Sequence, residues 1–507
     1  MMSNNSYTEI RNGDVPAGLS DIPVVEYDLF YEIVTNMLAD ERYHCVSYFC
    51  HRSGESLKFI CCIADDGSGA IRIIGHEKKD DGAPLRSLTA SCHAMHIFER
   101  EIHEAWGINF EGHPWLKPVR YPHDRVDSLS MMDNYPFYQI EGEELHEVGV
   151  GPIHAGVIEP GHFRFICNGE KVLHLEIQLG YQHRGLEKLI REAGGGLRRS
   201  LLAEDIAGDT AVGHSLAHAQ LIESLAGFEP SLSLQAERCI ALELERIAVH
   251  IGDTAALCGD VAYQLGQVAC EALRTLVINT TQFWCGNRFG KSLVRPGGTN
   301  YPLTGEIAGE ILKVLEEVDR RFSNVVDCVF SLPSVLGRFE DIGTVTRQQA
   351  VSIGAVGMAA RTCGVPRDIR ATHAFQYFRK IAVAPVMQET GDVLARGMLR
   401  ALEVKEAIKF IRQLIAGRED SAEKSGRPQY DLKLRPGSIA VSLVEGWRGE
   451  ICHVALTDGE GRLTRYLVKD PSVHNWMALA LAVRNQEISD FPVCNKSFNL
   501  SYCGHDL

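Results

Sequence analysis

Apolar residues in the first part of the chain follow two different periods. Between residues 24 and 42, positions such as Leu29, Ile33 and Leu38 recur every three or four residues, which predicts an amphipathic helix. Shorter runs alternate between apolar and polar residues, the period of a half-buried strand. The predicted strands cover 45–51, 57–63 and 70–75, and a second predicted helix covers 90–105. Together these elements indicate a compact α+β domain.

A second pattern begins at residue 148. Alternating runs at 162–167 and 171–179 flank Asn168-Gly169, a dipeptide typical of a tight β-hairpin. Beyond residue 186 the helical period dominates for most of the remaining chain. The predicted long helices cover 232–258, 262–284, 304–329, 346–362 and 387–416. The predicted late elements are strands at 438–444, 450–457 and 463–469, a helix at 475–484, and an irregular tail to residue 507.

These patterns predict an α+β fold with four parts. The parts are an N-terminal tail (1–24), a small α+β domain (25–125), a charged linker without a clear period (126–147), and a mainly helical domain with small β-sheets at its two ends (148–507). A chain of 507 residues is long enough to form two or three domains, which agrees with this division.

Composition and charge narrow the classes of function. The net charge of −15 argues against a nucleic-acid-binding surface, which needs a basic stripe. The first residues have neither the basic start nor the apolar segment of a secretory signal, and no run of 18 apolar residues occurs, so we expect no membrane span. The fifteen cysteines include no C-x-x-C pair, so they predict mostly buried, reduced side chains rather than a zinc or iron–sulfur cage.

The stretch from Gly180 to Ser215 is the densest group of polar residues between apolar flanks. It begins with His183-Arg-Gly-Leu-Glu-Lys188, directly after a predicted strand, and ends with Gly213-His-Ser215. Two interpretations fit this pattern. The residues form a functional site at the end of a strand, or they are ordinary surface charges at the start of a helix.

Two groups of motifs resemble subunits of respiratory complex I. Residues 99–114, Glu-Arg-Glu-Ile-His-Glu-Ala-Trp-Gly-Ile-Asn-Phe-Glu-Gly-His-Pro, are similar to the signature of the bacterial C subunit, with Glu104 in place of an aspartate. Later motifs resemble the D subunit and the large subunits of membrane-bound nickel–iron hydrogenases. They are 151–154, 159–164, 183–188, 287–298, 361–370 and 389–396. This fused order is that of formate hydrogenlyase and related group 4 hydrogenases, so 25–125 resembles a C-subunit (30-kDa-type) domain and 148–507 resembles a D-subunit or hydrogenase large-subunit-like domain.

The chain departs from the hydrogenases at the metal ligands. In those enzymes two C-x-x-C pairs hold nickel and iron, because this metal pair needs soft thiolate ligands. The corresponding positions here are Ala207 and Thr210 in the first motif, and Ser501 and Gly504 near the C-terminus. The resemblance therefore implies no nickel–iron site, and it is closest to energy-converting hydrogenase-related complexes, whose large subunit lacks these cysteines.

The resemblance also suggests which residues line the former metal cavity. We expect His154, His183, Asp209 and His214 to be proton-transfer groups, because His and Asp suit that chemistry near a redox centre. His154 matches the family's quinone-contacting histidine, whereas the family's tyrosine falls on or beside Gly208. The candidate quinone or ligand pocket comprises His154, Arg367, Asp368 and Arg370. The alternative is that these side chains are relics that pair with one another.

The function implied is that of a large subunit in a membrane-associated respiratory or hydrogenase-related oxidoreductase complex. This complex would be similar to an NADH:quinone oxidoreductase or a hydrogenase, and the chain itself would bind no cofactor. Expected partners are a small subunit carrying a [4Fe–4S] cluster and antiporter-like subunits of a membrane arm, with quinone as a possible substrate and no nucleic acid. The expected place is peripheral, on the cytoplasmic side of the inner (cell) membrane. A catalytically silent scaffold is the alternative, and an active nickel–iron hydrogenase is a third hypothesis.

Overall fold

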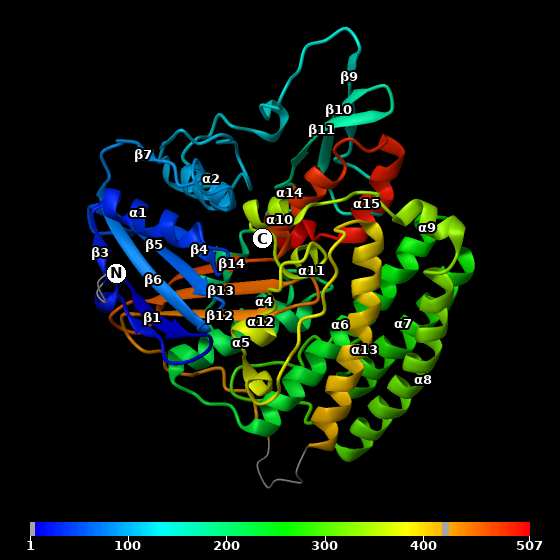
Figure 1. Cartoon of the computed structure of the whole chain (residues 1–507). Coiled ribbons are helices and arrows are strands. Elements are labelled where there is room, and N and C mark those ends of the chain that lie inside the picture. The colour runs from blue at the N-terminus through cyan, green and yellow to red at the C-terminus, as the bar shows by residue number, and fades with distance from the viewer. Residues whose placement is uncertain (1–5, 418–424) are drawn as a thin grey trace.

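The computed structural model describes residues 6–417 and 425–507 and confirms the predicted α+β class. An N-terminal sheet lies on one side of the molecule, a bundle of long helices lies on the other, and the C-terminal strands run between them (Figure 1). A three-stranded sheet with order β11-β10-β9 projects beyond both. Its strands are β9 (Leu145–Val150), β10 (His162–Asn168) and β11 (Lys171–Gln178).

The N-terminal sheet is buried on both faces. Its order is β1-β6-β5-β4, with the short β3 paired to β6. The strands are β1 (Thr8–Arg11), β3 (Val24–Val25), β4 (Tyr43–Ser53), β5 (Ser56–Asp65) and β6 (Ala70–Lys79). Side chains such as Phe59 and Ile74 pack towards α1 (Tyr27–Leu38) and α2 (His96–Trp106), and others such as Ile60 and Ile73 join the core of the helical domain. The two domains therefore share a core.

The helical domain is built around four long helices, α6, α7, α8 and α13. Their lengths and apolar faces agree with the predicted periodicity to within a few residues, except that α13 begins later than predicted. The helices from α3 onward are α3 (Leu186–Glu192), α4 (Gly196–Glu204), α5 (Ala211–Ala226), α6 (Leu232–Asp260), α7 (Gln264–Cys285), α8 (Gly305–Val329), α9 (Pro333–Phe339), α10 (Arg347–Ser352), α11 (Gly357–Arg361), α12 (Ile369–Thr372), α13 (Val393–Ala416), α14 (Ser472–Ala482), α15 (Phe491–Phe498) and α16 (Tyr502–Asp506). Among the described residues, none of these helices combines the length and apolar character needed to cross a bilayer.

The predicted N-terminal tail takes part in two sheets. Strand β1 pairs with β6, and β2 (Ala17–Gly18) adds to the edge of β12 (Ser438–Glu445). The resulting sheet has order β14-β13-β12-β2, with β13 (Glu450–Thr457) and β14 (Leu463–Lys469) as predicted. The sequence did not predict the short strands β1 and β2, because two to four residues are too few to establish a period.

Three predicted elements differ from the structure. The helix predicted at 346–362 is divided between α10 and α11, because Gly354 and Gly357 have φ angles of 69° and 59°. The helix predicted from 387 begins only at Val393, after Gly391 with φ of 67°. The tail predicted to be irregular contains α15 and α16. In the first two cases a glycine turn interrupts an apolar pattern that by itself predicts a continuous helix. In the third case, α15 and α16 are too short to show a clear period.

The cysteines behave largely as predicted. All fifteen are free thiols in the structure, and all except Cys92, Cys328 and Cys503 are buried. Burial raises the pKa of most of these thiols, for example that of Cys239 to about 12, so they remain protonated and act as small apolar side chains.

Asn12 fastens the N-terminal segment to the C-terminal sheet, which yields a test of the fold. Its amide donates to the carbonyls of His373 (2.7 Å) and Leu443 (2.8 Å), and its oxygen accepts from Gln220 (2.9 Å) and the Leu443 N–H (2.8 Å).

We predict that Asn12→Leu lowers the free energy of unfolding by about 2–4 kcal/mol, because it leaves buried polar groups without partners. Thermal unfolding of the full chain measures this, with the exposed Asn300→Leu as control. Equal stability of the two variants would contradict the role given to Asn12.

Candidate functional site

The C-terminal residues form the centre of the candidate site, and the stretch that begins at Gly180 packs on them. The Asp506 carboxylate accepts from the N–H groups of Gly180 (2.8 Å) and Gln182 (2.9 Å). The Nδ1 atom of His183 lies 2.8 Å from the carbonyl oxygen of Asp506. Burial lowers the pKa of His183, so its imidazole is neutral near pH 7. The loop thus owes its shape to contacts with residues more than 300 positions away.

Arg184 joins three segments of the site through backbone carbonyls. Its guanidinium donates to the carbonyls of Asp205 (2.6 Å), Ile206 (2.9 Å) and Cys503 (2.9 Å). A guanidinium has five N–H donors in a fixed plane, so it can hold several carbonyls in a set geometry. Arg184 is therefore a positioning residue that connects the former metal motifs at both ends of the domain.

The first former metal motif is closed by an ion pair. Asp209 receives two hydrogen bonds of 2.6 Å from Arg448, and Arg448 also donates to Thr210 Oγ1 (3.2 Å) and to the Asn499 carbonyl (2.6 Å). The Arg448 side chain is only 3% exposed, whereas that of Asp209 is 39% exposed. The Trp447 indole donates to the Asp209 carbonyl at 2.9 Å. Arg448 thus spans the distance between the two former ligand motifs.

The second former metal motif leaves no space for a ligand side chain. A Cβ atom built on Gly504 would lie 2.7 Å from the carboxylate of Asp470 and 2.8 Å from Ser501 Oγ. The Ser501 hydroxyl accepts from the Gly504 N–H, and Ala207 and Thr210 supply no sulfur on the opposite side. Two hydroxyl side chains, a methyl group and a hydrogen atom do not match the soft donors that nickel and iron require in such a centre. The residues present therefore do not fit a nickel–iron site.

Asp470 belongs to a chain of hydrogen-bonded groups in the protein interior. His214 Nε2 lies 3.1 Å from Asp470 Oδ2, and His214 Nδ1 lies 3.1 Å from His453 Nε2. His453 Nδ1 is 2.7 Å from the Tyr466 hydroxyl oxygen, which is 2.8 Å from His218 Nδ1. All five side chains are buried. Five titratable side chains thus form a continuous hydrogen-bonded chain from Asp470, beside the former metal motif, to His218.

The protonation of this chain follows from its burial. Burial lowers the pKa of His218 to about 3 and that of His453 well below its usual range, and it raises the pKa of Tyr466. Burial also acts to raise the pKa of Asp470, but the hydrogen bond from His214 and the charge of Arg448 outweigh it and lower that pKa. At rest, this chain of groups therefore has a carboxylate at Asp470 and neutral rings at His453 and His218.

His154 lies in the hairpin above the C-terminal segment. Its Nε2 is 2.8 Å from the carbonyl oxygen of Gly161, and a Cβ atom on Gly161 would meet the Tyr502 ring at 2.7 Å. The loop around it exposes Ile153 and Val157 by 81% and 86%. The hairpin that carries His154 therefore packs on Tyr502 at the start of α16, at a face with exposed apolar side chains.

Arg367 lies apart from the histidines, at the contact between the two domains. Its guanidinium donates to Asp66 (2.7 Å) and to the Glu41 carbonyl (3.0 Å) of the N-terminal domain. Within the described residues, neither its hydrogen bonds nor those of His154 join the two side chains. Arg367 therefore holds the N-terminal domain against the helical domain.

Asp368 and Arg370 belong to a buried ion network under the β12–β13 turn. Arg370 is paired with Asp368 (2.7 Å) and Glu243 (3.1 Å), and Asp368 also caps α12. Burial acts to lower the pKa of Arg370, but the charges of these two carboxylates outweigh it and raise that pKa, so the guanidinium stays ionised. The other members of the network are Arg246, His250, Arg361, Glu403 and Glu445.

The predicted site residues thus fall into two groups. The structure gathers His154, His183, Asp209 and His214 around the C-terminal segment. It places Arg367, Asp368 and Arg370 in separate contacts, which hold the domains and the helices in position.

Comparison with known proteins explains this arrangement. Residues 260–436 match the family described as respiratory-chain NADH dehydrogenase, 49 Kd subunit, and residues 25–137 match its 30 Kd subunit. The chain is a fusion of 30-kDa-type and 49-kDa-type complex I-like domains. The resemblance inferred from the motifs is thereby confirmed.

Curated relatives and a solved structure agree with this assignment. Hydrogenase-4 component G of Escherichia coli is 25% identical over 83% of this chain and 76% of its own length. An NADH-quinone oxidoreductase subunit from Herpetosiphon aurantiacus is 26% identical over 71% of this chain and 98% of its own length. A chain from the archaeal membrane-bound sulfane sulfur reductase shares the fold, with a TM-score of 0.66 and 20% identity over 73% of this chain and 100% of that chain. This chain is thus a subunit of a complex I-related, membrane-associated hydrogenase or oxidoreductase complex.

Sequence analysis of this complex I-like chain missed four residues of the site. Arg448, His453, Tyr466 and Asp470 lie in or beside strands β13 and β14, whose runs were interpreted only as structural. A histidine inside a strand that is buried on every residue, as His453 is in β13, was the available signal. Their partners, His214 and Asp209, lie 239 or more residues earlier in the chain.

The contact between Gly504 and Asp470 yields a stability test of this complex I-like chain. We predict that Gly504→Ala destabilises the full chain by about 1–3 kcal/mol, because the new methyl group meets a buried carboxylate that is held by His214. Gly309→Ala in α8 is the matched helical control, since nothing outside the local helix backbone lies within 4 Å of its Cβ position, and it should stabilise the chain by about 0.5–1 kcal/mol. Thermal unfolding measures both; a stabilising Gly504→Ala would show that the position is open.

Proposed function

We propose that this chain is the large subunit of a membrane-associated, complex I-related oxidoreductase that reduces quinone or another acceptor without a nickel–iron centre of its own. In this proposal a [4Fe–4S] cluster on a small partner subunit supplies the electrons. Antiporter-like subunits of a membrane arm use the accompanying charge movement for ion translocation. The chain lies peripherally, on the cytoplasmic side of the membrane. The relatives are named as subunits of hydrogenases, of formate hydrogenlyase and of NADH-quinone oxidoreductase, which motivates membership of such a complex.

The observation that carries the proposal is the buried chain Asp470–His214–His453–Tyr466–His218. Reduction of a quinone consumes two protons for two electrons, so the site needs a route for protons as well as electrons. Neutral imidazoles and a phenol each carry both a donor and an acceptor, so they can pass a proton along hydrogen bonds. The lowered pKa values of His218 and His453 keep both rings neutral at rest, so each ring offers one hydrogen-bond donor and one acceptor.

The surface of the site also supports the proposal. Asp209 is 39% exposed next to the exposed Gly208, and His154 lies in a hairpin with exposed apolar residues. An acceptor bound between them would have a carboxylate and an imidazole near its ring oxygens. Carboxylates and imidazoles are the side-chain groups most often used for general acid–base catalysis.

The first test separates a catalytic subunit from a scaffold. We expect the double variant His154→Ala/Asp209→Asn to assemble into the complex and to lower quinone reductase turnover at least tenfold, a conservative figure for the loss of positioned proton-transfer groups. The matched control is His146→Ala/Asp327→Asn, at two exposed positions. Full activity of the first double variant would favour the scaffold, and one nickel atom per purified complex by metal analysis would revive the hydrogenase.

The second test addresses the proton route. Tyr466→Phe removes only the hydroxyl that joins His453 and His218, so we predict slower turnover and a larger solvent isotope effect with an assembled complex. Tyr48→Phe is the matched control, because Tyr48 is also buried but its hydroxyl has no hydrogen-bond partner among the described residues. If both variants turn over like the wild type, protons take another route.

A further inference from the structure

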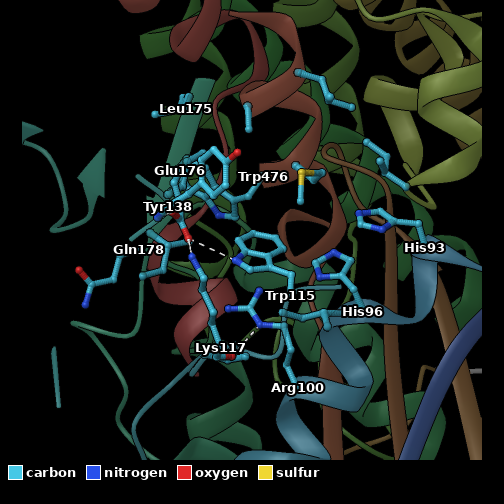
Figure 2. A pocket seen from close by; sticks show the side chains of 18 of the residues that line it. His93, His96, Arg100, Trp115, Lys117, Tyr138, Leu175, Glu176, Gln178 and Trp476 are labelled. Atoms are coloured by element: carbon cyan, nitrogen blue, oxygen red, sulfur yellow. Dashed lines mark hydrogen bonds and ion pairs between the residues drawn. The ribbon is translucent and has the colours of Figure 1, made fainter. Parts of the chain in front are cut away.

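A large cavity lies between the two domains and is reached by His505 of the C-terminal segment, but not by His154, Asp209 or His214. Its volume is about 610 Å³, within the range of small-molecule sites. Figure 2 shows it bounded by His93, His96 and Trp115 on one side and by Trp476 and Leu175 on the other. The first three residues come from the N-terminal domain and the others from β11 and α14 of the helical domain. The cavity reaches the surface beside Tyr138, which is 54% exposed.

Flat rings stack along one wall of the cavity. The His96 ring is stacked on Trp115 with centroids 5.6 Å apart and on His93 at 5.1 Å. The Arg100 guanidinium lies 4.4 Å from the centroid of the Trp115 ring. The facing wall is mainly apolar and includes Val473, Trp476 and Leu481. Stacked rings opposite an apolar wall suit a planar aromatic ligand.

Three charged side chains of the cavity, Glu176, Lys117 and Arg100, already bond to protein groups, whereas Arg484 at its edge is exposed. Glu176 accepts from Lys117, from the Trp115 indole (3.2 Å), from the Tyr135 hydroxyl (3.2 Å) and from the Tyr138 N–H (2.7 Å). Arg100 donates to two backbone carbonyls at 2.7 Å. With Glu176 neutralised by Lys117, Arg100 gives the cavity a positive character. The cavity therefore suits an uncharged or anionic ligand rather than a cation.

His96 is the polar group that this arrangement leaves without a partner. It is 3% exposed, lines the cavity, and has no hydrogen bond to either ring nitrogen within the described chain. Burial lowers its pKa well below the usual range, so the ring is neutral and offers one donor and one acceptor. A buried polar group without a partner reduces stability, unless something else binds to it.

We propose that this interdomain cavity binds a planar, uncharged or anionic aromatic compound of two or three fused rings, with a ring carbonyl or ring nitrogen hydrogen-bonded to His96. The rings lie along Trp115 and against Trp476. This site is separate from the proposed acceptor site, because none of His154, Asp209 and His214 lines the cavity. Two sources share this chemistry: heteroaromatic compounds such as flavins, and quinones.

The test uses two probes on the purified full chain, lumiflavin for the heteroaromatic source and menadione for the quinone source. Calorimetric titration should give a Kd on the order of 10 µM for at least one probe. The probe that binds identifies the source. Ala480→Trp places a large ring in the cavity and should abolish that binding without loss of thermal stability, since Ala480 is partly exposed. Absence of binding for both probes, or equal binding to Ala480→Trp, overturns the proposal.

The variant His96→Leu separates a ligand-binding role of the imidazole from a purely structural one, through the affinity for the probe and the stability of the free chain. It should weaken binding of the probe roughly tenfold. It should also leave the ligand-free chain at least as stable as the wild type, because it removes an unsatisfied polar group. Wild-type affinity of His96→Leu for the probe overturns the proposal.

The matched control is His76→Leu in the same domain. Among the described residues His76 is also buried with neither ring nitrogen bonded, but its ring is stacked on Phe59 at 4.3 Å, inside the core and not in the cavity. Burial lowers the pKa of His76 to about 3, so its ring is neutral as well. The control should keep wild-type affinity for the probe, and a loss of affinity equal to that of His96→Leu overturns the assignment to this cavity. The outcome does not depend on quinone turnover, so it stands apart from the tests of the proposed function.

Discussion

The close contact between Gly504 and Asp470 is the constraint on which the site depends. A glycine at this position lets the carboxylate approach to within 2.7 Å of where a Cβ would lie. The carboxylate in turn bonds to His214, and through it to His453. A buried carboxylate is stable only when partners compensate for lost hydration, so each neighbour fixes the next. Where a hydrogenase has sulfur and metal, this chain has a carboxylate and hydrogen-bonded rings.

A polar interface between the domains holds the same region from the other side. Glu450, at the start of β13, lies 2.6 Å from His44 Nε2 and 2.6 Å from Lys469 Nζ. Because Lys469 immediately precedes Asp470, the position of that carboxylate depends on a contact with the N-terminal domain. The motif at 99–114 has a similar task. Glu99 accepts from Ser87, Thr89 and the Leu88 N–H, so its carboxylate orders a buried loop rather than facing solvent.

Periodicity in the sequence predicted the elements well and the connections between them poorly. Strands β12, β13 and β14 and helices α6, α7 and α8 matched because each has many residues that repeat one period. The break at Gly354 and the late start at Val393 come from single glycines with positive φ, which an apolar pattern does not reveal. The motifs placed His183, Asp209 and His214 in the site, but Arg448 and Asp470 could be found only through contacts across 239 and 256 positions.

Helix α14 links the acceptor site to the interdomain cavity. At its start, the Ser472 N–H donates to Asp470 at 2.8 Å and the Ser472 hydroxyl accepts from the Ser501 N–H at 2.9 Å. Farther along, Trp476 lines the cavity and donates to the Ser501 carbonyl at 3.3 Å. A ligand that shifted Trp476 would therefore act on the segment that carries Gly504. Any such coupling between the two sites is reciprocal, so protonation of Asp470 or acceptor binding beside Asp209 must change the affinity of the cavity by the same factor.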